Sequence, residues 1–417
     1  MKCFSGKEAP WLFEHSLQRL LNLLSNIGEE ARIVGGAIRD TLLKKSINDI
    51  DIATTSFPEK TLYHMRKSGF HVMASGINFG TITVTAKDKT YEITTLRSDT
   101  QADGRYTKVL FRKNWKTDAE RRDFTINALY SDKTGQIYDD IGGLEDIENR
   151  VLRFIGNSEN RIKEDFLRIL RFFRFYACLD IKNPHREGIQ AIGKLKNGLK
   201  RISSERIWKE MKKLLSASNP IQSLLQMHKS GVLPMVFPDI KSHWISSIHA
   251  LIKAEQALAS TPDPLLRLIC LIPADSGKIK KLANHLKFSN AEKKRLIQWA
   301  DSTPISLNIS YPELKNRVYR EEKQATLDQL YLSFATIYDA SKNQEPSIKY
   351  VRLRNFILRW TAHFPLKGVD LIKIGMNPGP QIGEALKKLE AKWIQSNFQE
   401  NKNSLISLAL KSSFHDQ

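Results

Sequence analysis

Two aspartates separated by a single residue follow shortly after a glycine pair. This pattern constrains the fold of the 417-residue chain more than any other feature. Residues 31–34 form a short strand-like run that ends at Gly35-Gly36, and a helical pattern follows to about Lys45. The next apolar run begins with Asp49-Ile50-Asp51. Residues two apart on a strand point to the same face of a sheet, so both carboxylates are expected on one side. The pattern predicts an α/β unit of strand, glycine turn, helix and acidic strand.

The chemistry of this pattern is phosphate binding beside a metal site. Backbone N–H groups at a glycine turn that opens a helix bind phosphate, and Arg39 offers a forked guanidinium to the same group. Two carboxylates beside a phosphate suit Mg²⁺, and two such ions about 4 Å apart activate an attacking hydroxyl and stabilise a leaving phosphate. We therefore take Gly35, Gly36 and Arg39 as nucleotide-binding candidates, and Asp49 and Asp51 as catalytic metal ligands. A loop glycine pair with two solvated acids is the alternative interpretation.

The other patterns extend this organisation along the chain. Up to residue 155 they predict a helix at 58–68, strands at 81–86 and 91–96 around a hairpin at 87–89, and a long polar loop at 99–116. Beyond residue 155 they predict helices almost throughout, among them 160–179, 203–215 and others within 371–398. No Gly-x4-Gly-Lys-Ser/Thr sequence occurs, which disfavours a P-loop ATPase.

A second motif runs from Arg121 to Ala128 with the sequence Arg-Arg-Asp-Phe-Thr-Ile-Asn-Ala. Tandem arginines entering a helix can bind a triphosphate or a sugar, which makes Arg122 a nucleotide-binding candidate. Asp123 and Asn127 are four residues apart, so we expect them on one helical face, holding a ribose or supporting the phosphate site. A charged helix start with a local ion pair is the alternative.

A third group of charges lies on the helix predicted for residues 160–179. On one continuous helix, several charged residues share an arc of about 80° with Asp165 at its edge; they are Arg161, Glu164, Arg168 and Arg171. A carboxylate accepts from an exocyclic amine, and an arginine donates to a ring nitrogen or a carbonyl. One aspartate plus one arginine could therefore accept cytosine and adenine and reject uracil and guanine. An exposed helix with salt bridges is the alternative.

Charge is distributed unevenly over the chain, whose net charge is +20. Residues 1–155 hold 23 Lys/Arg against 21 Asp/Glu, whereas residues 156–417 hold 42 against 24. A nearly neutral part joined to a strongly basic one predicts a catalytic head attached to a body that binds a polyanion, with nucleic acid favoured.

The composition also indicates a compartment. Three widely spaced cysteines fit neither a disulfide framework nor a zinc site, and a reducing environment is the simplest interpretation. No apolar run approaches the ~20 residues that a transmembrane helix needs, and the N-terminus shows no signal-peptide pattern. We expect a cytoplasmic protein without a membrane partner.

These motifs resemble those of the bacterial class II tRNA nucleotidyltransferases, the CCA-adding enzymes, which share a superfamily with bacterial poly(A) polymerase. The glycine pair, Arg39-Asp40 and the two aspartates resemble the family's motif A, and Arg121 to Ala128 resembles motif B. Three shorter segments resemble motif C (Asp139-Asp140-Ile141-Gly142-Gly143), motif D (Glu164-Asp165-x-x-Arg168) and a looser motif E (Ser204-Glu205-Arg206-Ile207). The tail segment from Gly368 to Pro380 is also similar to the family's C-terminal pattern.

The resemblance implies a fold in four parts. Residues 1–155 would form an α+β head of the polymerase-β nucleotidyltransferase type, followed by an all-α neck at 156–215, body at 216–302 and tail at 303–417. The head would be catalytic, the neck would recognise the base of the nucleotide, and the tail would bind tRNA. The partner would be tRNA, held at its acceptor stem and elbow mostly by shape and phosphates.

The resemblance also implies an activity: addition of C, C and A to the 3′ end of tRNA from CTP and ATP, with Mg²⁺ held by Asp49 and Asp51. Gly36, Arg39 and Arg122 would hold the triphosphate and sugar, with Asp123 and Asn127 in the same nucleotide site. Asp165 and Arg168 would read the base edge, with Arg171 and Arg174 assisting. The polar loop at 99–116 would correspond to the family's flexible loop. Asp88, Glu92 and Asp99 all remain candidates for a further active-site acid.

Four alternatives stay open. A poly(A) polymerase would share the head, but its branch usually carries a Gly-Arg-Arg-Phe-like stretch, in place of which this chain has Ala74 to Thr81. Partial addition, of CC or A only, is the second alternative. A non-catalytic RNA-binding protein should have lost Asp49 or Asp51, and both are present. A membrane-surface protein ranks last, because the basic residues are spread over several helices.

Overall fold

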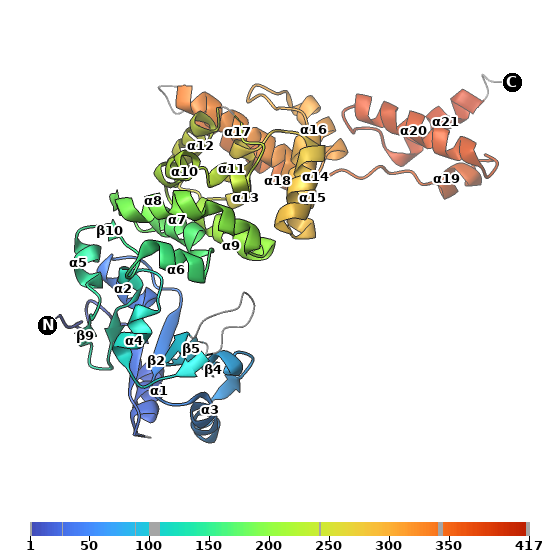
Figure 1. Ribbon diagram of the computed structural model, residues 1–417. Coiled ribbons are helices and arrows are strands. Elements are labelled where there is room, and N and C mark those ends of the chain that lie inside the picture. Colours follow the sequence, from blue (N-terminus) through green and yellow to red (C-terminus); the bar gives the residue numbers. More distant parts are fainter. Residues whose placement is uncertain are drawn as a thin grey trace. The chain divides into compact units, whose positions relative to one another are not determined.

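A seven-stranded mixed sheet forms the centre of the first of two units, Met1–Pro238, and the second unit, Asp239–Gln417, is helical (Figure 1). The computed structural model describes residues 2–26, 28–87, 89–99, 109–241, 243–340 and 345–413. Across these residues, none of the helices combines the length and the apolar character needed to cross a bilayer.

The sheet has the strand order β3-β4-β5-β2-β1-β8-β9. Its strands are β1 (Ala31–Val34), β2 (Ile50–Thr54), β3 (His71–Met73), β4 (Thr81–Ala86), β5 (Lys89–Thr95), β8 (Tyr130–Ser131) and β9 (Ile137–Tyr138). Only β2 and β5 run parallel, and their register places Asp51 opposite Glu92. The predicted strands and the hairpin between β4 and β5 are confirmed.

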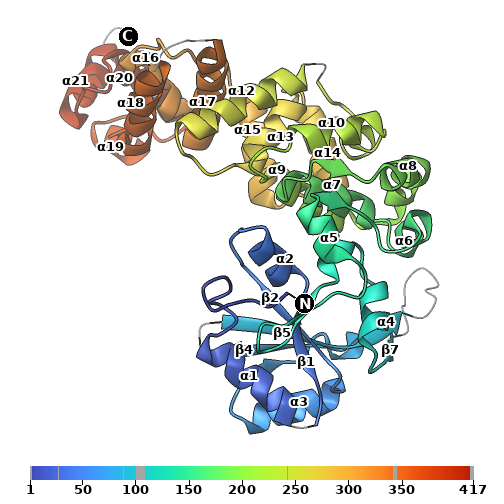
Figure 2. The same ribbon diagram turned by 90° about the vertical axis from the view of Figure 1, so that its left-hand side faces the viewer.

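Helices cover both sides of the sheet: α1 (His15–Asn26) and α3 (Pro58–Lys67) lie on one side and α2 (Gly36–Leu42) on the other (Figure 2). The sequence analysis missed α1, whose apolar face packs against β1 and α3. Its buried residues recur at helical spacing and are Leu17, Leu20, Leu21 and Leu24.

The loop predicted for residues 99–116 is partly wrong. Val109–Phe111 forms strand β7, which pairs with β6 (Arg97–Asp99) in a separate small sheet, and α4 (Trp115–Glu120) begins inside the predicted range. The Asn114 side chain caps α4 by accepting from the Thr117 N–H at 2.9 Å. Residues 100–108 lie outside the described residues, and so does the candidate acid Asp88.

The long helix predicted for residues 160–179 is two helices, α6 (Ser158–Glu164) and α7 (Arg168–Cys178). Asp165 leaves the helical conformation, with φ −150° and ψ 107°, and its side chain accepts from the backbone N–H of Leu167 at 3.0 Å. An aspartate that bonds a neighbouring N–H competes with helix formation, so the arc computed for one continuous helix does not apply. The charges still meet, because Glu164 pairs with Arg161 and Arg168.

The helices after the sheet extend the first unit. They are α5 (Gly143–Glu148), α6, α7, α8 (Arg186–Leu195), α9 (Ser204–Leu215), α10 (Ile221–Lys229) and α11 (Leu233–Val236). Helix α7 packs an aromatic face onto the sheet domain: Phe172 stacks on Phe154 with ring centroids 5.4 Å apart, and Phe124 contacts Phe172 and Phe175. These buried rings pack α7 against Phe124, in the middle of the second motif. This packing fixes the direction in which α7 presents its arginines.

The second unit is a set of ten helices within the described residues. Their bounds are α12 (Trp244–Ala257), α13 (Pro264–Leu271), α14 (Ser276–Leu286), α15 (Asn290–Asp301), α16 (Tyr311–Arg320), α17 (Lys323–Ala340), α18 (Glu345–Arg359), α19 (Gly368–Lys373), α20 (Pro380–Gln395) and α21 (Lys402–Ser413). Helices α12, α17 and α18 pack together. A separate core near the C-terminus is built around Trp393, with Leu389, Leu371 and Leu405.

We expect Glu29 to make the first unit pH-sensitive below neutrality. Desolvation raises the pKa of this carboxyl, but hydrogen bonds from Thr55, Lys113 and Lys60 outweigh it and lower the pKa to about 2. A depressed pKa contributes stability above the ordinary value of 4.5 and loses it as the pH falls from 4.5 towards 2. Glu29→Gln should therefore cost about 2 kcal/mol at pH 7, and urea unfolding should show this difference shrinking between pH 5 and pH 3. Glu59→Gln, an exposed acid on α3, should change neither.

Candidate active site

The glycine turn between β1 and α2 requires a residue without a side chain. Gly35 has φ +73°, and a Cβ built on it would lie 3.2 Å from the carbonyl oxygen of Asn127 and 3.8 Å from Nη1 of Arg122. Only glycine adopts this conformation without strain. The turn therefore brings the first and second motifs together, with the Arg122 guanidinium directed at it.

Three acids gather at the start of β2 and on its neighbour. Asp49 precedes β2 and Asp51 lies on it, and both are exposed. Glu92, on β5, is paired with Asp51 in the parallel register, so both side chains project from the same face. Desolvation by the surrounding protein, together with the negative charges of Glu92 and Asp49, raises the pKa of Asp51 to about 6, and Arg122 opposes this shift.

The sequence left the choice between Asp88, Glu92 and Asp99 open, and strand pairing distinguishes the two of them that the structure describes. Glu92 shares the sheet with Asp51, whereas Asp99 ends β6 in the separate two-stranded sheet. The available signal was the alternation along residues 91–96, which puts Glu92 on one face of a strand but does not say which strand lies beside it.

Arg122 is fixed by a buried carboxylate that the sequence analysis did not single out. Asp118, on α4, is 1% exposed and accepts from Arg122 Nη2 at 3.0 Å, from Arg121 Nη2 at 2.7 Å and from the Tyr130 hydroxyl at 2.7 Å. Desolvation raises the pKa of Asp118, but the two arginines and the tyrosine outweigh it, so the pKa is lowered.

The two arginines do not enter a helix as predicted: α4 ends at Glu120, and Thr125–Asn127 forms a single 3₁₀ turn.

A second buried chain of hydrogen bonds links Arg39 to α7. Arg39 is 9% exposed; its Nε and Nη2 donate to Asp40, and its Nη1 donates to the Asn127 amide oxygen at 2.6 Å. The Asn127 amide nitrogen donates to Asp123 at 3.0 Å, and Arg171 Nε donates to the other Asp123 oxygen at 2.7 Å. Asp123 and Asn127 are in contact, but the prediction that they share a helical face is wrong, because Asp123 precedes the 3₁₀ turn Thr125–Asn127. Arg39 makes three hydrogen bonds inside the protein and so orients this chain. Its Nη2 also borders the glycine turn, 3.9 Å from a Cβ built on Gly36.

The break between α6 and α7 holds the predicted base-reading pair. Asp165 accepts from Arg206 Nη2, on α9, at 2.8 Å. Arg168 Nη1 donates to the Arg161 carbonyl oxygen and to Glu164, and Arg168 Nη2 donates to the Arg121 carbonyl oxygen at 3.2 Å. Both side chains are therefore held before any nucleotide binds. Arg206 belongs to the motif E segment.

Arg174 completes a cluster of three arginines around one aromatic ring. The guanidinium carbons of Arg39, Arg171 and Arg174 lie 4.9, 5.4 and 4.2 Å from the centroid of Phe175. Arg174 also pairs with the buried Glu210 at 3.3 Å, and desolvation lowers its pKa. The predicted residues of α7 thus face the same region of the first unit as Arg39.

The three acids could supply some of the ligands of a divalent cation, but they do not form a complete coordination shell. Among the described residues, no three His, Cys, Asp or Glu side chains are grouped to hold a metal by themselves. Mg²⁺ is usually bound by one or two carboxylates, with substrate phosphates and water completing the shell. Desolvation, and then the negative charges of Glu92 and Asp49, raise the pKa of Asp51. A cation at this place would offset those charges, so Asp49, Asp51 and Glu92 suit such an ion.

Family models match three consecutive parts of the chain: a poly(A) polymerase head domain at residues 31–153, an RNA- and SrmB-binding site of polymerase A at 184–243, and a tRNA nucleotidyltransferase domain 2 at 260–409. The ranges of these family models and the division into two units do not follow the four predicted parts. The junction between the two units, Pro238–Asp239, falls inside the body predicted at 216–302.

Whole-length relatives extend the similarity. The CCA tRNA nucleotidyltransferase 1, mitochondrial, of Danio rerio is 32% identical over 96% of this chain and 92% of that protein, and the CCA-adding enzyme of Streptococcus gordonii is 31% identical over 91% of this chain and 93% of that protein. The Bacillus stearothermophilus CCA-adding enzyme in complex with CTP superposes with a TM-score of 0.74 at 25% identity, covering 96% of this chain and 98% of that one. The expected fold and the resemblance read from the motifs are confirmed. The chain therefore belongs to the family of the CCA tRNA nucleotidyltransferases.

Proposed function

We propose that this chain adds C, C and A to the 3′ end of tRNA from CTP and ATP, releasing pyrophosphate at each step. The observation that carries the proposal is the meeting of Asp49, Asp51 and Glu92 with the Gly35 turn and Arg122 in one site. Acids beside a phosphate-binding turn are the requirement for transfer of a nucleotidyl group to a hydroxyl. Membership of the family supplies the tRNA substrate and the two nucleotides.

In this mechanism the terminal ribose hydroxyl of the RNA attacks the α-phosphate of the nucleotide, and the bond to pyrophosphate breaks. Gly35 and Gly36 let the phosphates approach the backbone, and Arg122 places its free Nη1 edge next to them. Arg39 keeps Asn127 and Asp123 in position for the ribose. Mg²⁺, which we propose as the cofactor, would be held by Asp49 and Asp51 with Glu92 as the further acid, and would supply charge stabilisation on the reacting phosphate.

We propose that Asp165 and Arg168 read the base edge, with Arg171 and Arg174 nearby. The support is that both side chains are already oriented, Asp165 by Arg206 and Arg168 by two backbone carbonyls. A fixed acceptor beside a fixed donor matches the amine and ring nitrogen of cytosine and adenine.

Asp165→Asn should therefore relax base selection. The amide presents a donor where the carboxylate offers only acceptors, so UTP should gain relative to CTP by about tenfold or more in kcat/KM. Single-nucleotide addition measured for each of the four NTPs gives the ratios. Glu205→Gln, which removes an exposed neighbouring charge, should leave them unchanged. Ratios that stay the same in Asp165→Asn would contradict the assignment.

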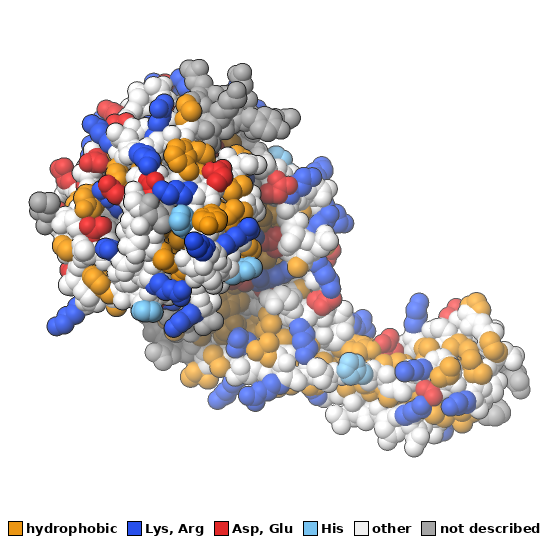
Figure 3. Space-filling model, turned by 90° about the horizontal axis from the view of Figure 1, so that it is seen from below, with side chains coloured by type: hydrophobic (Ala, Val, Ile, Leu, Met, Phe, Trp, Pro, Cys, Tyr) orange, Lys and Arg blue, Asp and Glu red, His pale blue; other side chains and the backbone are white. Residues whose placement is uncertain are grey.

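We also propose the four-part division with tRNA bound by the tail at 303–417. In the second unit a groove between α16 and α20 carries Arg320 and Lys387, and neither forms an ion pair with any residue that the structure describes. Glu390 in the same groove accepts from the Tyr319 hydroxyl. Figure 3 shows lysine and arginine side chains beside apolar ones at the right-hand end of the view, where Figure 1 places α19–α21. The groove suits a phosphate backbone.

Replacing both Arg320 and Lys387 with alanine should weaken tRNA binding several-fold and flatten its salt dependence. Two lost phosphate contacts lower the slope of log affinity against log salt by about 1.5. Filter binding at four salt concentrations measures both quantities, and the KM for CTP should stay the same. An unchanged slope would place the RNA elsewhere.

The experiment that tests the activity uses purified protein, Mg²⁺ and a tRNA transcript lacking its 3′ end, with each NTP alone and then CTP with ATP. Two C and one A followed by arrest are expected. Long A tails from ATP alone would identify a poly(A) polymerase, and arrest after CC, or A added only to a transcript ending in CC, would identify a partial enzyme.

We further propose a cytoplasmic location, supported by the three free thiols, which cell fractionation tests.

A further inference from the structure

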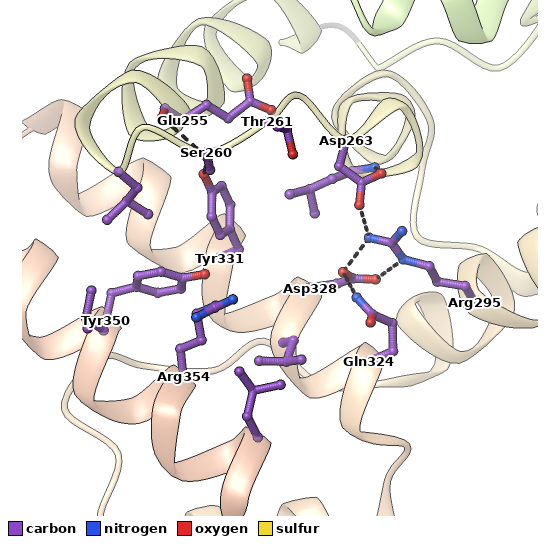
Figure 4. Close-up of a pocket in the computed structure, with 15 residues that line it drawn as sticks. Glu255, Ser260, Thr261, Asp263, Arg295, Gln324, Asp328, Tyr331, Tyr350 and Arg354 are labelled. Carbon is purple, nitrogen blue, oxygen red and sulfur yellow. Dashed lines mark hydrogen bonds and ion pairs between the residues drawn. The ribbon is translucent and has the colours of Figure 1, made fainter. Parts of the chain in front are cut away.

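The ion pairs around Arg295 in the second unit serve the packing of its helices. Arg295, on α15, donates to Asp263 at 2.6 Å and to Asp328 at 2.8 Å (Figure 4). Asp263 directly precedes α13 and Asp328 lies on α17, so these contacts join three helices of the same unit. A contact in the first unit is different, because it meets the residues that we propose to read the base.

Gly198 has the tightest surroundings of all the glycines that the structure describes. A Cβ built on it would lie 1.9 Å from Cδ1 and 2.1 Å from Cε1 of Phe166, whereas ordinary contacts of a Cβ begin at 3.4 Å. Gly198 does not have a positive φ, so its backbone conformation also suits residues with a side chain. Glycine is needed here because the aromatic ring occupies the space that a side chain would take.

The ring of Phe166 lies along one face of the 3₁₀ helix η3 (Lys196–Arg201). Residues three apart in a 3₁₀ helix lie one above the other. Arg201, three residues after Gly198, places its guanidinium carbon 5.6 Å from the centroid of this ring. The helix itself is anchored by Leu199, which is buried. The ring of Phe166 is therefore held against a fixed piece of backbone.

Phe166 directly follows Asp165 at the break between α6 and α7. Asp165 has an extended backbone conformation, and a rotation about this backbone would carry the ring of Phe166 into Gly198 or away from it. The Asp165 carboxylate is held by Arg206, near the start of α9. One segment of the chain, residues 196–215, therefore holds both the ring of Phe166 and the carboxylate of its neighbour.

We propose that Phe166 and Gly198 are positioning residues for base selection, an inference that rests on the proposed function. The ring seated on Gly198 fixes the turn that carries Asp165, and so fixes where the carboxylate accepts from the exocyclic amine of cytosine or adenine. Neither side chain has a polar group to offer to a base, so both act through Asp165.

A methyl group at position 198 gives the size of the disturbance. It would displace the ring by about 1.5 Å, the difference between 1.9 Å and an ordinary contact of 3.4 Å, and a misplacement of about 1 Å far from the chemistry can lower the rate about a hundredfold. The added methyl group brings no charge and no hydrogen-bonding group, so its effect on the choice of base would come from the displaced turn.

The test compares Gly198→Ala with Gly193→Ala in the full-length protein. Gly193 lies on α8, where an added Cβ meets nothing within 4 Å beyond its own helix, so it controls for the loss of a helical glycine. Single-nucleotide addition to a tRNA transcript lacking its 3′ end is measured with each of the four NTPs. Gly198→Ala should lower kcat/KM for CTP by about tenfold to a hundredfold and raise the ratio of UTP to CTP incorporation. Gly193→Ala should leave both unchanged.

Phe166→Leu and the double variant test whether the contact is the cause. Leucine removes the ring and makes room for a methyl group at position 198. Phe166→Leu should itself raise the UTP-to-CTP ratio, and adding Gly198→Ala to it should change the ratio little further, because both changes break the same contact. Effects that add would overturn the proposal, and so would a folded Gly198→Ala protein with wild-type ratios or with an equal loss for all four NTPs.

Circular dichroism shows whether each variant folds, and if Gly198→Ala does not, unchanged ratios in Phe166→Leu would overturn the proposal. Asp165→Asn is measured on the same transcript. Ratios that change in Asp165→Asn but not in Gly198→Ala or Phe166→Leu would refute only the positioning role. Ratios that stay the same in Asp165→Asn would refute base recognition by Asp165 itself. CCA addition by the wild-type protein is measured beside them, so failure of the proposed function is seen separately.

Discussion

Asp51→Asn is expected to abolish nucleotide transfer, slowing incorporation of the first C by at least about a thousandfold, while affinity for tRNA stays within about twofold. Asp51 is the register partner of Glu92, and the charges of Glu92, Arg122 and Asp49 all act on its carboxylate. The amide keeps the size of the side chain but removes one negative charge and one cation ligand. RNA affinity is expected to survive because the excess of basic residues lies after residue 155.

Single-turnover addition with saturating CTP measures the rate at which Asp51→Asn incorporates the first C, and filter binding measures its affinity for tRNA. Glu59→Gln supplies the control, since it removes an exposed acid from α3 without touching the site. Transfer at the wild-type rate by Asp51→Asn would mean that the cation-binding acids have been placed wrongly. If the variant also loses tRNA affinity, the first unit contributes much of the binding to RNA.

Asp118→Asn is expected to cost about 3 kcal/mol in stability and to lower kcat/KM for both nucleotides at least tenfold. Removing one partner of a buried ion pair leaves the other charge uncompensated, and Arg122 and Arg121 would both lose their carboxylate. Arg122 would then no longer hold a fixed direction towards the Gly35 turn. Because Asp118 has a lowered pKa, its contribution is present above its ordinary pKa of about 4 and declines as the pH falls below it.

Tyr130→Phe separates the two effects of Asp118. It removes the hydroxyl that donates to Asp118 at 2.7 Å and accepts from Arg122 Nε at 3.1 Å. Asp118 keeps both arginines, so stability should fall by about 1 kcal/mol and nucleotide kinetics should change far less than in Asp118→Asn. Urea unfolding gives the stabilities, and the KM and kcat for CTP show whether the loss concerns binding or the chemical step. A stable Asp118→Asn protein with normal kinetics would contradict the positioning role of Asp118.

The amino-acid sequence alone predicted the acidic strand, the glycine turn before it and the hairpin after it. The glycine pair, the two aspartates and the hairpin follow from local rules, because alternation along a strand and the freedom of glycine at positive φ depend on only a few consecutive residues. The charge excess after residue 155 likewise needs no structure. These features predicted an α/β unit with phosphate and metal chemistry and favoured a nucleic-acid partner, whereas the polymerase-β type of head and the tRNA substrate were implied by the family resemblance.

Only the tertiary structure decided which residues act together across the chain. Glu92 was selected by the pairing of β5 with β2, and Asp118 by its burial beneath Arg122. Helix α7 starts at Arg168 because Asp165 satisfies a backbone N–H and reaches Arg206 from α9, 41 residues away. Each of these outcomes depends on partners distant in sequence, whose proximity is set by packing of the whole unit, and local periodicity does not contain that information.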